Sequence, residues 1–170
     1  ISRMQQAVRV LYGSASPSEA FQSTRLDIAA VDLAEFAKNV AANAGIADVQ
    51  CTGGNEPLFV RADEFPLEDV FAHVLKNADR HRTPGTPIVI ELSSSDSTAT
   101  VGIRNDGPQI PDELLARIFE YGVSEQPDAG NRGQGLFVAR TYMAKMGGTI
   151  TARNVEGGVS FELGLQRVRD

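Results

Sequence analysis

The residues best placed for chemistry form a polar stripe along one predicted helix, residues 64–82. With about 3.6 residues per turn, one face of this helix is apolar and consists of Leu67, Val70, Phe71, Val74, Leu75 and Ala78. The opposite face points to water and carries Glu68, Asp69, Lys76 and Asp79. His73, Asn77, Arg80 and His81 fall between the two faces. An amide oxygen, a cation and two imidazoles at the border of core and solvent suit a metal-bound polyphosphate.

Asn77 is the residue of this stripe that we expect to bind a metal ion. Its neutral amide oxygen suits Mg²⁺, which keeps most of its water ligands and takes others from nucleotide phosphates. His73 lies one turn earlier and can polarise a water molecule or satisfy a buried carbonyl group, which is the commoner role of such a histidine. Arg80 and His81 can contact phosphate oxygens, although a cation on a helix flank is usually just solvated.

Composition and charge exclude several other classes of protein. A chain of 170 residues suits one domain, and a net charge of −6 with a pI near 4.9 argues against a nucleic-acid partner. No apolar run approaches the roughly 18 residues of a membrane span. Cys51 is the single cysteine and the chain has two histidines, so neither an internal disulfide nor a zinc site is expected.

The pattern of the whole chain predicts an α+β fold. Helices are expected at residues 1–12, 33–43, 64–82, 111–119 and 135–146, and strands at 25–31, 49–52, 57–61, 87–94, 98–105, 149–154 and 159–165. Residues 121–134 mix Gly, Pro, Asn, Asp and Ser without periodicity and predict a long mobile loop. Such interleaving favours a two-layer α/β sandwich, with helices on one face of a mixed, mostly antiparallel sheet.

The first residues of the chain read as the end of a longer helix. Ile1, Met4, Val8 and Leu11 have near-helical spacing, and residues 14–23 read as a linker. A helix this short needs a packing partner. We therefore divide the chain into residues 1–23, the end of a preceding helix and a linker, and residues 24–170, one domain.

Two further segments carry candidate binding groups. Alternation along the strand 98–105 points Asn105 inward, where it can read an adenine edge, and the turn at Gly107 allows a close approach of the backbone to a flat ligand. A local hydrogen bond from Asn105 to the backbone is the simpler alternative. Glycines at 130–135 before a helix present free N–H groups that suit a phosphate, and a flexible loop is equally compatible with them. Neither a dinucleotide-binding fingerprint nor a P-loop is present.

The order of these segments resembles the ATP-binding catalytic domain of sensor histidine kinases. These domains belong to the Bergerat-fold (GHKL) group, which also holds DNA gyrase, Hsp90 and MutL proteins. The similarity runs from about residue 32 to residue 165. His73-x-x-x-Asn77-Ala78 matches the N box, Asn105-Asp106-Gly107-Pro108-Gln109-Ile110 the G1 box, Ile118-Phe119-Glu120 the F box and Gly133-Gln134-Gly135-Leu136 the G2 box.

The resemblance implies ATP and Mg²⁺ as cofactors, a catalytic group and a set of nucleotide contacts. The catalytic group is His73, Asn77 and Arg80, with Asn77 as the magnesium ligand and residues 121–134 as the ATP lid. The nucleotide contacts are Asn77, Arg80, His81, Asn105, Gly107, Ile110, Phe119, Arg132, Gly133, Gln134, Gly135, Leu136 and Ser160. The implied activity is transfer of the γ-phosphate to a histidine on a separate helical domain.

That phosphoacceptor histidine is missing from this chain. Both histidines lie in the stripe, and neither belongs to the His-Glu-x-x-x-Pro pattern of a phosphoacceptor helix. Residues 1–12 would then be the tail of that dimeric helical domain. The implied partners are this domain and a response regulator, with no direct membrane contact by this segment. We expect a cytoplasmic location, within a parent protein that can be membrane-anchored.

Several residues depart from the family pattern. Asn105 replaces an aspartate that contacts the adenine amino group, which predicts weaker affinity because the charge is lost. Gln109 replaces a glycine, Tyr121-Gly122 replaces Pro-Phe, and His73 stands where related ATPases have a glutamate base.

Two other functions are compatible with the same sequence. One is a serine kinase of the anti-sigma-factor type on this fold, and the amphipathic residues 1–12 speak against it. The other is a nucleotide-free module that binds a protein partner.

Overall fold

The structure, a computed structural model, describes residues 25–120 and 135–168. Its elements, in chain order, are β1 (Ala29–Asp32), α3 (Leu33–Asn43), β2 (Val49–Thr52), β3 (Phe59–Ala62), α4 (Glu64–His81), β4 (Ile88–Ser94), β5 (Thr98–Asp106), α5 (Asp112–Leu115), α6 (Gly135–Lys145), β6 (Thr149–Val155) and β7 (Gly158–Gln166). The helix predicted at 1–12, the linker at 14–23 and the loop at 121–134 lie outside the described residues.

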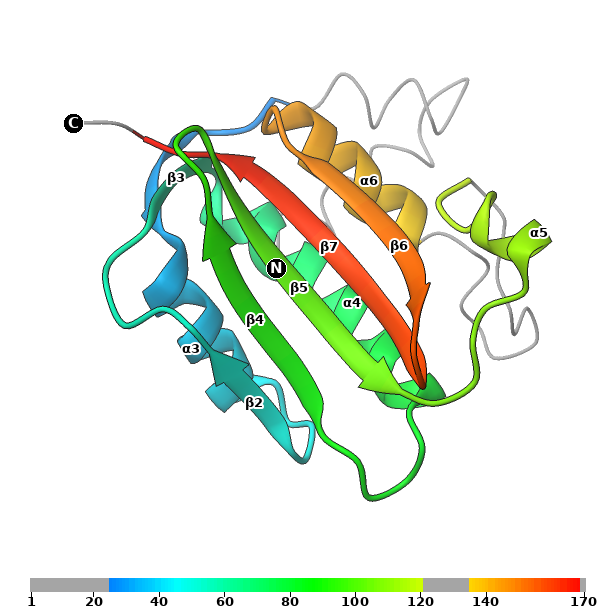
Figure 1. Cartoon of the computed structure of the whole chain (residues 1–170). Coiled ribbons are helices and arrows are strands. Elements are labelled where there is room, and N and C mark those ends of the chain that lie inside the picture. The colour runs from blue at the N-terminus through cyan, green and yellow to red at the C-terminus, as the bar shows by residue number, and fades with distance from the viewer. Residues whose placement is uncertain (1–24, 121–134, 169–170) are drawn as a thin grey trace.

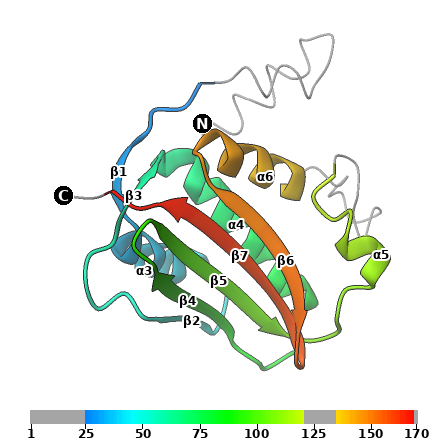
Figure 2. The same ribbon diagram turned by 45° about the horizontal axis from the view of Figure 1, so that its top comes forward.

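A five-stranded sheet forms one layer of the domain, and helices α3, α4 and α6 cover one of its faces (Figures 1 and 2). The strand order is β2-β4-β5-β7-β6, in which the β2–β4 pair is parallel and the other pairs are antiparallel. A separate two-stranded sheet joins β1 and β3. This arrangement confirms the predicted two-layer α+β sandwich with a mostly antiparallel sheet.

Strands β2 and β3 follow each other in sequence but belong to different sheets. The connection passes close to β4 at two glycines with positive φ, 79° at Gly53 and 71° at Gly54. A Cβ atom would lie 2.7 Å from the Leu92 carbonyl oxygen at Gly53 and 2.9 Å from Leu92 Cδ1 at Gly54. Only glycine allows this approach without moving a neighbour. Gly53 and Gly54 therefore let the chain leave β2 in close contact with β4.

Aspartate side chains fix the starts of α3 and α4 on the covered face. Asp32 Oδ1 accepts from the amide of Ala34 at 3.1 Å and from the amide of Leu58 at 3.0 Å, so Asp32 is the N-cap of α3. Asp63 caps α4 by accepting from the Phe65 amide at 3.2 Å. Its second oxygen accepts from the Asp27 amide at 2.9 Å, so one buried carboxylate ties the start of α4 to the chain before β1.

The apolar face of α4 is the centre of the hydrophobic core. All six apolar residues predicted for this face are at most 1% exposed. They pack under inward side chains of the sheet such as Ile90, Ile103 and Phe161, and Phe71 meets Phe36 of α3 edge to face at 5.2 Å. Burial of this face fixes the rotation of α4, and therefore the direction in which its polar stripe points.

Helix α5 is shorter than predicted. The sequence favours a helix over residues 111–119, but the structure has one turn, Asp112–Leu115. Pro111 gives it no side-chain cap, and beyond it the amide of Arg117 bonds to the carbonyl of Leu114, an i to i+3 contact that tightens the chain into turns. The other predicted helices and strands within the described residues differ from the observed ones by at most a few residues at their ends.

Candidate nucleotide-binding site

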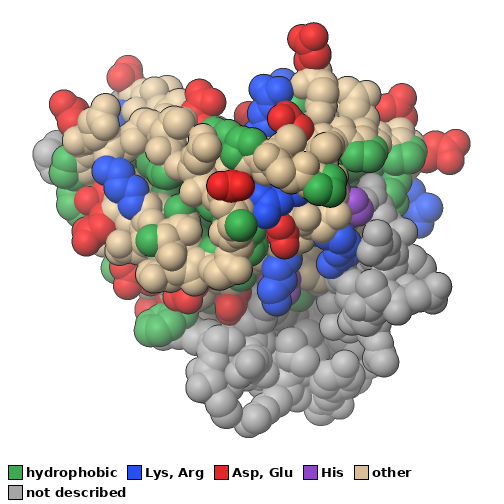
Figure 3. Space-filling view, turned by 90° about the horizontal axis from the view of Figure 1, so that it is seen from below, with side chains coloured by type: hydrophobic (Ala, Val, Ile, Leu, Met, Phe, Trp, Pro, Cys, Tyr) green, Lys and Arg blue, Asp and Glu red, His purple; other side chains and the backbone are tan. Residues whose placement is uncertain are grey.

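The polar stripe of α4 lies at the edge of the core. His73, Asn77 and His81 follow each other at one-turn spacing and are half-buried, whereas Arg80 is exposed. On the face seen in Figure 3, a histidine is visible among Lys and Arg side chains; both histidines of the chain belong to α4. The helix therefore offers a half-buried amide at Asn77 with cations toward the solvent.

Asn105 points into the interior at the end of β5. It is 1% exposed and lies in register with Ile88 of β4 and Val159 of β7 on the covered face of the sheet, whereas Arg104 is exposed. Its Nδ2 donates to the carbonyl oxygen of Asp106 at 3.3 Å. A carboxylate has no donor and could not make this bond. The local hydrogen bond is thus one specific use of the asparagine at this position.

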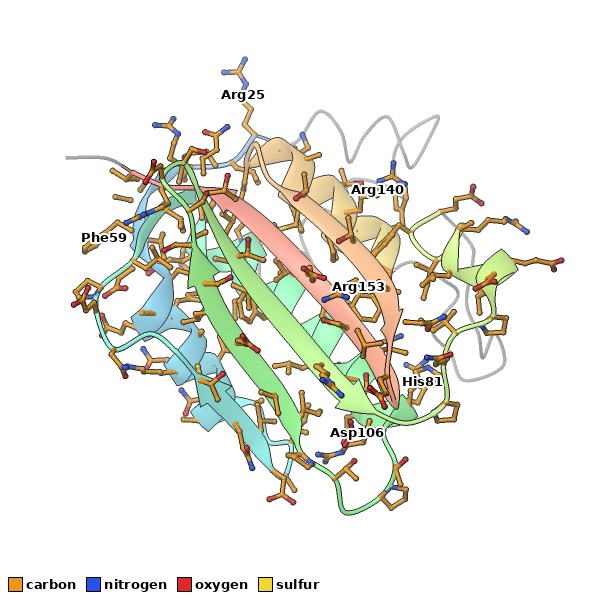
Figure 4. All side chains as sticks on the ribbon, viewed as in Figure 1. Arg25, Phe59, His81, Asp106, Arg140 and Arg153 are labelled. Atoms are coloured by element: carbon orange, nitrogen blue, oxygen red, sulfur yellow. The ribbon has the colours of Figure 1, made fainter. Side chains whose placement is uncertain are left out.

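The turn after β5 brings that strand against the end of α4. The Thr83 amide donates to the Asp106 carbonyl at 2.8 Å, and the Gly107 amide donates to the Gly157 carbonyl at 2.9 Å. Gly107 has φ 151°, and a Cβ atom there would lie 2.3 Å from the carbonyl oxygen of His81. Figure 4 shows His81 and Asp106 at the same end of the domain. The sequence predicted a close approach of the Gly107 backbone to a ligand. In the structure, this backbone lies close to the end of α4.

Asn154 holds the next part of this turn and was not among the predicted site residues. Its Oδ1 accepts from the Ile110 amide at 2.9 Å, and its Nδ2 donates to the Ile110 carbonyl at 2.8 Å. Gln109 adds a bond from Nε2 to the Val155 carbonyl at 2.8 Å. Asn154 shares with Asn105 an inward position beside Val159. Strand alternation in the last hairpin could have revealed it, because an inward amide needs a partner.

Gly135 begins α6 directly beside the stripe. A Cβ atom at Gly135 would lie 2.8 Å from His73 Nδ1, so the N-box and G2-box segments are in contact. Burial, followed by the charge of Lys76, lowers the pKa of His73 below its ordinary value of 6.5. Leu136 is half-buried in the first turn of the same helix. Arg132, Gly133 and Gln134 lie outside the described residues.

Phe119 lies on a different side of α6. Its ring meets Phe161 edge to face at 6.1 Å, and it lines a groove of about 600 Å³. The described residues around this groove are Phe119, Glu120, Phe137, Arg140, Thr141, Ala144 and Lys145. The F-box phenylalanine is thus packed against the sheet through Phe161.

Ser160 is placed away from the predicted site. Val159 lies opposite Asn105 on the covered face, so its neighbour Ser160 points to the other face of the sheet. There Ser160 is 7% exposed, between Arg104 on β5 and Arg153 on β6. Figure 4 shows Arg153 on this uncovered face. Ser160 is therefore left out of the proposed site, because its place in β7 turns its side chain to the face away from α4.

The donor set fits a magnesium ion held mainly by a nucleotide. In the described part of the chain, no three His, Cys, Asp or Glu side chains come together in a way that could hold a metal. The half-buried amide of Asn77 supplies one oxygen, and Mg²⁺ in such sites takes its other ligands from phosphates and water.

Among residues 25–120 and 135–168, no helix is long and apolar enough to span a bilayer.

Comparisons with known proteins agree with this geometry. A profile described as "Histidine kinase-, DNA gyrase B-, and HSP90-like ATPase" matches residues 62–169. The chain is 33% identical over 109 residues to signal transduction histidine-protein kinase AfsQ2 of Streptomyces coelicolor, covering 62% of this chain and 20% of that protein. It is 32% identical over 152 residues to swarming motility regulation sensor protein RssA of Serratia marcescens, covering 82% and 32%.

A solved structure shows the same fold. The nucleotide-free catalytic domain of histidine kinase ThkA is similar with a TM-score of 0.73 and 25% identity, over 84% of this chain and 97% of that one. The chain thus spans about a fifth to a third of the curated relatives named above and nearly all of this catalytic domain. It belongs to the histidine kinase-, DNA gyrase B- and HSP90-like ATPase family, as the resemblance of its boxes predicted.

Proposed function

We propose that this chain binds Mg-ATP and is the catalytic domain of a sensor histidine kinase. The observation that carries the proposal is the meeting of three separate segments around α4. The turn after β5 contacts α4 at His81, α6 begins against it at His73, and Asn77 lies between these two contacts. Helix starts offer unpaired N–H groups to phosphates, and Asn105 lies buried at the end of the neighbouring strand.

Roles within this site follow from position and charge. Asn77 would hold the magnesium ion, and Arg80 and His81 would lie toward the phosphates. Gly107, Ile110 and Asn105 would border the base, and Gly135 and Leu136 the start of α6. The proposal also includes Arg132, Gly133 and Gln134 as nucleotide contacts, on the basis of the sequence resemblance alone. Because the net charge of −6 opposes an anionic ligand, the metal ion and these local groups must supply the attraction.

The transfer step is proposed for the parent protein. The γ-phosphate would pass to a histidine on a helical domain whose tail is residues 1–12, and from there to a response regulator. Phosphoryl transfer requires mainly positioning and neutralisation of charge. No general base on this chain is therefore needed. A cytoplasmic location and the boundary near residue 23 belong to the same proposal.

Calorimetric titration with Mg-ATP tests the binding site. We expect binding by the unmodified chain and a loss of at least about tenfold in affinity, or 1.4 kcal/mol, in Asn77→Ala. The matched control is Asn39→Ala, which removes an exposed amide from α3. Absence of binding by the unmodified chain would favour the nucleotide-free module and overturn the proposal.

Mixing the chain with the helical domain of its parent tests the acceptor. Transfer to histidine gives a phosphoryl product that is labile to acid, whereas a phosphoserine product survives acid. An acid-stable product would favour the serine kinase and overturn the histidine assignment.

A further inference from the structure

The contact that brings α6 against α4 in the proposed site also points to a role for His73 itself. The imidazole of His73 on α4 occupies the space beside the backbone of Gly135 at the start of α6. A Cβ atom on Gly135 would lie 2.8 Å from Nδ1, 3.4 Å from Cε1 and 3.4 Å from Cγ of this ring. The nearest of these distances, to the ring nitrogen, is shorter than a non-bonded contact of a Cβ atom tolerates.

A lack of space for a Cβ atom, and not an unusual backbone conformation, explains the glycine at position 135. Gly135 is absent from the glycines with positive φ among the described residues, so its backbone is one that any residue can adopt. Alanine is the better helix former, by about 1 kcal/mol inside a helix and by less at a first residue such as Gly135. Glycine is nevertheless present at this position, where the His73 imidazole takes the space of a Cβ atom.

The ring is also well suited to pack there as a neutral group. His73 is half-buried, and its pKa is lowered first by burial and then by Lys76. An imidazolium beside the start of α6 would face the positive end of the helix dipole. A neutral ring avoids this repulsion.

We propose that His73 is a positioning residue that sets the distance between the start of α6 and Asn77. His73 and Asn77 are one turn apart on α4, so a shift of Gly135 against the imidazole changes the separation of the α6 amides from the Asn77 amide. This inference rests on the proposed nucleotide site. It assigns to His73 a packing role in place of the activation of water.

A double-mutant cycle tests the proposal by Mg-ATP titration. We expect Gly135→Ala to weaken binding about tenfold and His73→Ala about fivefold, within the range of coupled neighbouring sites. In the double variant, the new methyl group takes part of the space left by the ring, so we expect affinity no weaker than in Gly135→Ala. Losses that multiply to about fiftyfold would show independent roles and overturn the proposal.

Gly102→Ala is the matched control. Its Cβ atom would lie 3.9 Å from its nearest neighbours, and Gly102 likewise has no positive φ. We expect affinity and melting temperature to remain unchanged in this variant. Melting curves of the other variants separate loss of binding from loss of folding.

A nucleotide-free measurement separates this inference from the proposed function. In NMR spectra of protein with ¹⁵N-labelled histidine, we expect the His73 ring resonances to move in Gly135→Ala and to stay in place in Gly102→Ala. His81 serves as the internal reference. Unmoved His73 resonances in Gly135→Ala would overturn the contact even if the chain binds ATP, and moved resonances would support it even if the chain does not.

Discussion

Asn105 is a proposed ligand contact that also has a role in the fold. Its amide nitrogen donates to the Asp106 carbonyl, while the side chain stays 1% exposed. The family resemblance implies an aspartate at this position, whose charge would strengthen the bond to an adenine amino group. An asparagine would attract the adenine amino group less strongly, but it makes an internal hydrogen bond to the Asp106 carbonyl.

Restoring the carboxylate at this position is expected to destabilise the nucleotide-free protein. Asn105→Asp loses the donor to Asp106 and buries a negative oxygen near a carbonyl oxygen. We predict a loss of about 1–3 kcal/mol in the free energy of unfolding, measured by denaturant titration. Asn39→Asp on the exposed side of α3 is the control. An unchanged or higher free energy of unfolding would contradict this account of Asn105.

The pH dependence of stability is expected to report on His73. Its pKa is lowered by burial and by Lys76, so the folded protein holds the ring neutral in conditions where the unfolded chain already takes up a proton. The stabilisation is complete above the ordinary pKa of 6.5 and is lost as pH falls below it. We predict an NMR titration midpoint below 6.5 and a weaker loss of stability on acidification in His73→Gln. A midpoint above 6.5 would contradict the packing of a neutral ring.

At the scale of elements, the site depends on where strands and helices end. The last hairpin, β6 and β7, holds the turn after β5 through Asn154 and the Gly157 carbonyl, and this turn in turn contacts the end of α4. The position of Ile110 therefore depends on a side chain more than forty residues later in the chain. The hairpin therefore supports one side of the proposed binding site.

Removing the Asn154 amide should loosen this turn. Asn154→Ala loses both bonds to the Ile110 backbone and leaves a buried amide and a carbonyl without these partners. We predict a destabilisation of about 1–3 kcal/mol and faster hydrogen exchange at the Ile110 amide. Thr151→Ala, on the outer face of the same strand, is the control. Unchanged exchange at Ile110 would show that the turn is held by other contacts.

For the molecule as a whole, charge decides which ligand form can bind. The chain carries a net charge of −6, and free ATP is itself strongly anionic, so their long-range interaction is repulsive. Local cations such as Arg80 are exposed and screened by water. Binding of the nucleotide should therefore depend on its metal ion.

Chelation of Mg²⁺ is expected to weaken ATP binding at least about tenfold, which corresponds to 1.4 kcal/mol. Titrations in Mg²⁺ and in excess chelator measure the difference. The same pair of titrations on Asn77→Ala gives the control, since this variant should respond less to the metal. Equal affinities of the unmodified chain with and without the metal would contradict the role proposed for Asn77.

Much of this architecture could be predicted from the sequence by itself. The helix period placed six apolar residues of α4 in the core and the polar stripe beside them, because burial of one face sets the rotation of a helix. Strand alternation likewise predicted the inward direction of Asn105. The predicted start of the helix at residue 33 also agrees with α3, because Asp32 just before it is a residue type that caps helices.

Only the tertiary structure decided which segments meet. The bonds of Asn154 join residues 44 positions apart. The contact of His73 with Gly135 depends on the packing of α4 against α6. Local periodicity describes a residue relative to its own helix or strand. Distances between elements are set by the packing of the whole core, which no single segment encodes.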